Sequence, residues 1–153
     1  MTGVAEALFY HLDRRPVDAV LPVLLARCLE REWRVVVQVG SPERLAALDG
    51  HLWTYSDESF LPHGTLSDGF LDRQPIYLTT GPENPNGATV RFLVDRAPAP
   101  EDAAGYERLV VVFSGDDPDA LADARAQWKA LKARGLDVTY WQQDARGAFV
   151  RKA

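Results

Sequence analysis

The sequence is poor in the residues that form disulfides, metal sites and nucleic-acid surfaces. It has one cysteine, Cys28, so no disulfide can form within the chain, and a lone thiol favours a reducing cytoplasm. The three histidines, His11, His51 and His63, form no H-x₃-H spacing and no C-x₂-C pair occurs, so we expect no metal site. The formal net charge of -5 is unlike that of a protein that binds DNA by neutralising phosphates. We therefore expect any contact with DNA to be indirect.

Long apolar runs and glycine-rich phosphate loops are missing as well. No apolar stretch is long enough to cross a bilayer, and the N-terminus has no basic region followed by an apolar run, so we expect no membrane anchor and no signal peptide. Neither GxxxxGK[ST] nor GxGxxG occurs, and the first predicted strand leads into Asp13-Arg14-Arg15-Pro16. Without glycines the backbone cannot close around a phosphate. No G-x-S-x-G turn presents a serine nucleophile. We expect no catalytic residues and no cofactor.

Strand and helix patterns alternate along the chain. We predict strands at 4–12, 34–39, 76–80, 90–95, 109–113, 138–142 and 148–151. We predict helices from Pro16 to about Trp33, from Pro42 to about Leu52, near 98–102, and from Pro118 to Arg134. Pro22 lies in the second turn of the first helix, which leaves a later start open, and Cys28 lies on its apolar stripe. This alternation predicts one α/β domain over residues 1–153, with three layers and a largely parallel sheet.

One segment carries apolar side chains where the composition predicts a loop. Residues 55–74 are rich in Ser, Asp, Gly and Pro, yet the run LWTYSDESFLPHG at 52–64 contains Trp53, Phe60 and Leu61. Loops are usually polar because they face water. Such side chains either pack on their own domain or contact a partner, and the sequence leaves both possibilities open. For His63 we expect a hydrogen bond within the loop.

The last predicted helix combines cations with an aromatic ring. Asp117 and Pro118 suit its first turn, and Gly135 suits the residue after its end. Because successive helical residues advance by about 100°, one narrow arc holds Leu121, Arg125, Trp128, Lys129 and Lys132, while Ala124 and Leu131 should face the core. Either this is a solvated basic face with a core tryptophan, or it is a surface for a peptide with apolar residues and a free carboxyl terminus.

The chain resembles the chi subunit family of bacterial DNA polymerase III over nearly its whole length. The motif ESFLPH at 58–63, which follows a tryptophan, carries most of the resemblance. Further matches occur in the expected order: FYHL at 9–12, WRV at 33–35, NPNGA at 84–88, WK at 128–129, Gly135 and VTYWQQ at 138–143. The resemblance implies a Rossmann-like fold without enzymatic activity and a place in the clamp-loader assembly of the replicase. The alternative is a divergent nucleotide-binding enzyme on the same fold, which the missing phosphate loop disfavours.

The resemblance also implies two surfaces for partner proteins. Arg125, Trp128 and Lys129 match positions that bind the C-terminal tail of single-stranded DNA-binding protein, and Lys132 would add a further cation. Leu121 departs from the pattern, because the best-known member of the family has a lysine there.

The second implied surface contacts the psi subunit, or another replisome or helicase partner. It would include Trp53 and Phe60, with Leu61 beside them. Through these two surfaces the family holds the replicase on template coated with single-stranded DNA-binding protein.

Overall fold

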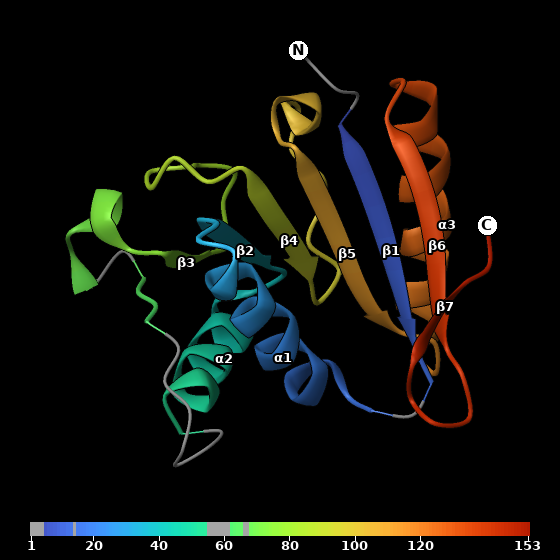
Figure 1. Ribbon diagram of the computed structural model, residues 1–153, viewed down its shortest axis with the longest axis horizontal. Coiled ribbons are helices and arrows are strands. Elements are labelled where there is room, and N and C mark those ends of the chain that lie inside the picture. Colours follow the sequence, from blue (N-terminus) through green and yellow to red (C-terminus); the bar gives the residue numbers. More distant parts are fainter. Residues whose placement is uncertain (1–4, 14, 55–61, 66–67) are drawn as a thin grey trace.

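A single sheet with helices on both faces forms the body of the molecule (Figure 1). The computed structural model describes residues 5–13, 15–54, 62–65 and 68–153. The strands are β1 (Glu6–Leu12), β2 (Val35–Val39), β3 (Ile76–Thr79), β4 (Val90–Val94), β5 (Arg108–Ser114), β6 (Asp137–Gln143) and β7 (Phe149–Arg151). The helices are α1 (Val17–Glu30), α2 (Pro42–Thr54) and α3 (Pro118–Ala133), with short 3-10 turns η2 (Leu71–Arg73) and η3 (Ala103–Gly105).

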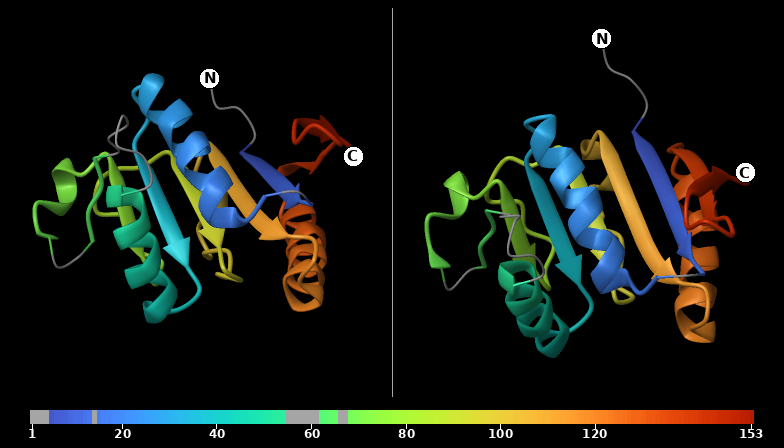
Figure 2. Two further views of the ribbon diagram at one scale, coloured as in Figure 1. Left: turned by 90° about the horizontal axis from the view of Figure 1, so that it is seen from below. Right: turned by 60° about the horizontal axis from the view of Figure 1, so that its bottom comes forward.

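The described strands pair in the order β3-β2-β4-β5-β1-β6-β7. All neighbours are parallel except β6 and β7, which are antiparallel. Helices α1 and α2 cover one face of the sheet and α3 covers the other (Figure 2). The predicted three-layer α/β fold with a largely parallel sheet is therefore confirmed. The helix predicted near 98–102 is a difference, because the structure forms the 3-10 turn η3 a few residues later.

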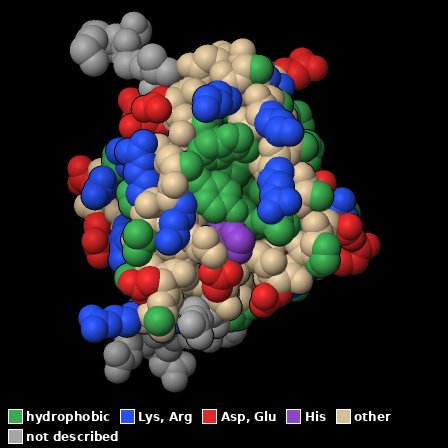
Figure 3. All heavy atoms as spheres, turned by 90° about the vertical axis from the view of Figure 1, so that its right-hand side faces the viewer, with side chains coloured by type: hydrophobic (Ala, Val, Ile, Leu, Met, Phe, Trp, Pro, Cys, Tyr) green, Lys and Arg blue, Asp and Glu red, His purple; other side chains and the backbone are tan. Residues whose placement is uncertain are grey.

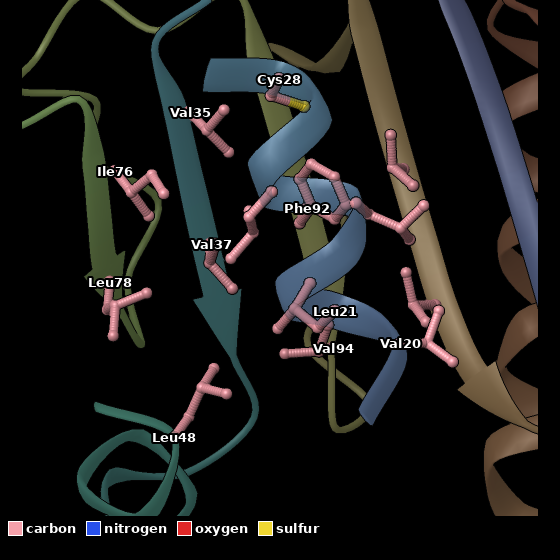
Figure 4. Packing of buried hydrophobic residues seen from close by; sticks show 14 of the residues in the cluster. Val20, Leu21, Cys28, Val35, Val37, Leu48, Ile76, Leu78, Phe92 and Val94 are labelled. Atoms are coloured by element: carbon pink, nitrogen blue, oxygen red, sulfur yellow. The ribbon is translucent and has the colours of Figure 1, made fainter. Parts of the chain in front are cut away.

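Two apolar clusters, one on each face, hold the layers together. On the α1 side, side chains of α1 pack on β2, β4 and β5, as Figure 4 shows for Leu21, Val37 and Phe92. On the α3 side, Ala124 and Leu131 pack with residues of β1 and β5. Every residue of β2 and β4 is buried because both faces of these strands are covered, and most of these residues are apolar. Cys28 is buried in the first cluster, as expected from its place on the apolar stripe.

Helix α1 contains Pro22 without ending there. Proline has no N–H, so the carbonyl of Asp18, four residues earlier, loses its usual partner within the helix. His51 of α2 replaces that partner, because its Nε2 lies 2.6 Å from the Asp18 oxygen. The Asp18 carboxylate also accepts a bond from Arg44 Nη2 at 2.8 Å. Contacts from α2 thus allow the helix to continue through Pro22. The sequence alone left this proline as a possible helix boundary.

Candidate functional site on helix α3 and strand β6

Helix α3 begins and ends where the sequence predicts. The Asp117 side chain accepts hydrogen bonds from the N–H groups of Asp119 and Ala120, at 3.0 and 3.2 Å. Pro118 occupies the first turn, where no N–H partner is needed. After the helix, Gly135 has a φ of 90°, a conformation that glycine adopts without strain. These caps fix the phase of the helix and hence the direction of its side chains.

The predicted arc on α3 is present in the structure. Ala124 and Leu131 are buried against the sheet, with exposed fractions of 3% and 0%. Trp128 is half-buried, whereas Arg125, Lys129 and Lys132 are exposed. Lys132 Nζ lies 6.0 Å from the centre of the Trp128 ring, within the range of a cation–π contact. The ring thus lies at the border between core and water, beside the cations.

Residues of β1 and β6 pack against the side chain of Trp128. Its ring meets Phe9 and Tyr140 edge to face, with centroids 5.6 and 5.8 Å away. Phe9 is fully buried, while Tyr140 and Val138 on β6 are half-buried next to α3. We call the set Arg125, Trp128, Lys129, Lys132, Val138 and Tyr140 the α3–β6 surface. Figure 3 shows this side of the molecule, with a continuous hydrophobic patch between basic side chains.

A polar network adjoins the α3–β6 surface at Tyr140. The Tyr140 hydroxyl lies 2.6 Å from His11 Nδ1, and His11 Nε2 lies 3.0 Å from Asp13 Oδ1. Burial raises the pKa of Tyr140, and the Arg125 guanidinium partly offsets that rise. The phenol therefore stays protonated at neutral pH and can take part in hydrogen bonds. Sequence reasoning missed Tyr140 and His11 as site residues.

The cations of this surface are not neutralised by the described part of the chain. Within residues 5–13, 15–54, 62–65 and 68–153, no carboxylate forms an ion pair with Arg125, Lys129 or Lys132. By contrast, Arg96, which follows β4, forms an ion pair with Asp123 of α3. Uncompensated cations around a half-buried ring form a surface that favours an anionic, partly apolar ligand.

The second predicted surface cannot be traced in the same way. Phe60 and Leu61, and the side chain of Trp53 in α2, lie outside the described residues, so this interface stays a prediction. His63 is described and is buried, with 3% exposed. Its Nε2 lies 3.0 Å from Asp49 Oδ1 and 3.3 Å from the Asp49 carbonyl. His63 therefore contacts α2, and the hydrogen bond within the loop that the sequence predicts stays a prediction.

Other kinds of site find little support in the described residues. No three His, Cys, Asp or Glu side chains there are grouped so that they could hold a metal ion. No helix among them is both long and apolar enough to cross a membrane. Burial raises the pKa of Cys28 to about 11, and the nearby guanidinium groups of Arg108 and Arg31 only partly oppose this. The thiol is therefore poorly suited to act as a nucleophile at neutral pH.

The fold and the α3–β6 surface define an α/β domain in which an aromatic and basic face of helix α3 lies next to strand β6. The model of the family described as DNA polymerase III chi subunit, HolC, matches residues 4–139. The chain therefore belongs to the DNA polymerase III chi subunit family. It is 31% identical over 85 residues to the probable DNA polymerase III subunit chi of Rickettsia prowazekii (strain Madrid E). That match covers 56% of this chain. It spans 52%, or about half, of the length of the relative.

Proposed function

We propose that this protein is a non-catalytic accessory subunit of bacterial DNA polymerase III, which works in the cytoplasm during DNA replication. In this role it links the clamp loader to the C-terminal tail of single-stranded DNA-binding protein. Membership of the chi family supports the assignment to the replicase. The observation that carries the tail assignment is the α3–β6 surface, where exposed cations that pair with no carboxylate of the described residues surround the half-buried Trp128 ring.

The chemistry of this surface suits the end of a peptide. An apolar side chain can rest on Trp128 and Val138, because both are half-buried and remain accessible. The terminal carboxylate can pair with Arg125, beside the Tyr140 hydroxyl, since a guanidinium binds a carboxylate through two parallel hydrogen bonds. Leu121 packs on the core cluster and widens the apolar part of the surface. It brings no charge, so Lys129 and Lys132 supply the remaining attraction.

A titration with a fluorescent peptide tests the proposal. The tail peptide of the organism's own single-stranded DNA-binding protein should bind at low salt, and added salt should weaken binding because exposed charges are screened. The same peptide amidated at its C-terminus should bind about tenfold more weakly, since it has lost one charge-assisted pair. If the two peptides bind equally, or neither binds at low salt, the tail assignment is wrong.

We also propose that the segment around Trp53, Phe60 and Leu61 contacts a psi subunit, or a replisome or helicase partner in its place. Three large apolar side chains within a stretch rich in polar residues support this. Aromatic anchors usually dominate the energy of such interfaces. The Phe60→Ala variant should therefore capture psi about tenfold less well than the wild type. If the variant has a normal melting temperature and captures psi as well as the wild type does, the proposed interface is wrong.

A further inference from the structure

The face of the sheet that carries α1 is only partly covered by helices. Helix α1 lies over β2, β4 and β5, while β1 and β6 continue beyond it, and no helix of the described residues lies above them on this face (Figures 1 and 2). Three adjoining cavities, of about 160, 390 and 260 Å³, lie along this uncovered face. The first shares Tyr10, Leu24 and Arg27 with the second, and Leu8 and Arg108 with the third. We call this continuous hollow the α1 groove.

Three arginines surround the first cavity of the α1 groove. Arg27 lies in the last turn of α1 and Arg31 is the C-cap residue that follows the helix; both are exposed, and Arg108 is the first residue of β5. The guanidinium carbons of Arg31 and Arg108 lie 5.0 and 4.6 Å from the centre of the Trp33 ring. Cation–π contacts of this kind hold the two guanidinium groups in place at the rim. The ring therefore fixes the position of charges that would otherwise be mobile.

Among these three arginines, Arg108 alone pairs with a carboxylate of the described residues. Glu6 pairs with Arg108, with 3.3 Å between Oε2 and Nε. In the part of the chain that the structure describes, neither Arg27 nor Arg31 forms an ion pair with a carboxylate. The guanidinium groups of Arg108 and Arg27 also act on the half-buried Tyr10, where they oppose the rise in its pKa caused by burial. A positive field thus reaches the floor of the groove, although the whole chain has a net charge of -5.

The floor of the first cavity is apolar. Leu24, Phe92 and Val110 line it and belong to the core, with exposed fractions of 8%, 2% and 5%. An apolar floor below a rim of fixed guanidinium groups suits a short chain segment in which an apolar side chain lies between carboxylates. Carboxylates and guanidinium groups form the strongest hydrogen-bonded pairs available at such a rim.

The two aromatic rings of the first cavity, Trp33 and Tyr10, do not suit a single strand of nucleic acid. Bases bind to such proteins by stacking on open ring faces. The Trp33 ring is already engaged by two guanidinium groups, and Tyr10 packs edge to face on Phe149 with centroids 4.6 Å apart. The negative net charge also opposes binding to a polyanion. Charge complementarity therefore favours an acidic peptide over a nucleic acid.

We propose that the α1 groove binds an internal acidic segment of a protein partner, with an apolar side chain on the floor and carboxylates paired with Arg27, Arg31 and Arg108. This site lies on the opposite face of the sheet from the α3–β6 surface. It does not need a free carboxyl terminus, and it does not depend on the tail assignment. Two partners, or two segments of one partner, can then be held at once.

A short fluorescent peptide tests this site without a known partner. In the probe, leucine and phenylalanine alternate with aspartates, and its C-terminus is amidated so that the α3–β6 surface has no terminal carboxylate to bind. The wild-type protein should bind it at low salt. The double variant Arg27→Glu/Arg31→Glu should bind the probe at least about tenfold more weakly, because two attractive charges have become repulsive.

Two matched controls separate the groove from unspecific attraction. The same peptide with asparagine in place of aspartate should not bind the wild type, which checks the role of charge without any change to the protein. The variant Arg125→Glu/Lys129→Glu carries the same change in net charge on the other face and should bind the aspartate probe as the wild type does. The proposal is overturned if the wild type fails to bind, if the asparagine peptide binds equally, or if the two double variants lose the probe equally. It is also overturned if an oligothymidylate displaces the probe at equal concentration.

Discussion

The double variant Arg125→Glu/Lys129→Glu is expected to bind the tail of single-stranded DNA-binding protein about a hundredfold more weakly than the wild type. Both side chains are exposed on α3, and no described carboxylate pairs with either. Each substitution removes a charge-assisted contact and adds a repulsive carboxylate, and each such change is worth about tenfold in affinity. The loss should be larger at low salt than at high salt because the interaction is screened.

The fold of this variant should be intact, since both positions face water and the core residues of α3 are unchanged. Its melting temperature, measured by circular dichroism, checks this. The variant Arg27→Glu/Arg31→Glu is the charge-matched control, because it alters net charge equally on the other face of the sheet. It should keep nearly full affinity for the tail. Equal loss in the two variants would show that the tail responds to net charge and has no defined site on α3.

The part of the α3–β6 surface that lies on α3 could be predicted from the sequence. A helix repeats every 3.6 residues, so the positions of Arg125, Trp128 and Lys132 relative to each other follow from their spacing alone. The rest of the surface comes from β6, which follows α3 in the chain. Tyr140 lies beside Phe9 because β6 pairs with β1 in parallel, in the register that places these two residues opposite each other. No local pattern fixes which strands become neighbours, so Tyr140 and His11 were not foreseeable as site residues.

Local sequence patterns also gave an incomplete prediction where a residue has its hydrogen-bond partner in another helix or strand. Pro22 looks like a helix boundary until His51 of α2 supplies the hydrogen bond that the proline cannot make. The run VRFLV at 90–94 predicts a strand correctly, but the sequence does not indicate that its arginine is fully buried, with 0% of it exposed. Charged side chains are rarely fully buried unless they are paired. The partners of Arg91 are spread between residues 38 and 106, so only the fold reveals them.

Replacing Arg91 with methionine is expected to lower the free energy of unfolding by about 3 kcal/mol. The side chain is fully buried, on the face of the sheet opposite α1. Its Nε and Nη2 donate to Gln38 Oε1 at 3.1 and 2.7 Å, and Nη1 donates to the Tyr106 hydroxyl at 3.1 Å. It also donates to the carbonyl oxygens of Gly81 and Glu83, which fixes the turn between β3 and β4 on the sheet.

Methionine fills much of the same volume but donates no hydrogen bond, so the buried Gln38 amide oxygen and the two partly buried carbonyls would lose this donor. Arg91→Lys should also destabilise the protein, because one ammonium group cannot reach acceptors arranged for a planar fork. Urea denaturation followed by circular dichroism measures both effects, and the dependence on urea should keep its slope while the midpoint falls. Arg73→Met, at an exposed position in η2, is the control and should change stability by less than about 0.5 kcal/mol. If Arg91→Met unfolds at the same urea concentration as Arg73→Met, the arginine network does not stabilise the fold, and the turn between β3 and β4 is held by its other contacts, such as those of Glu83 with Tyr77 and Thr79.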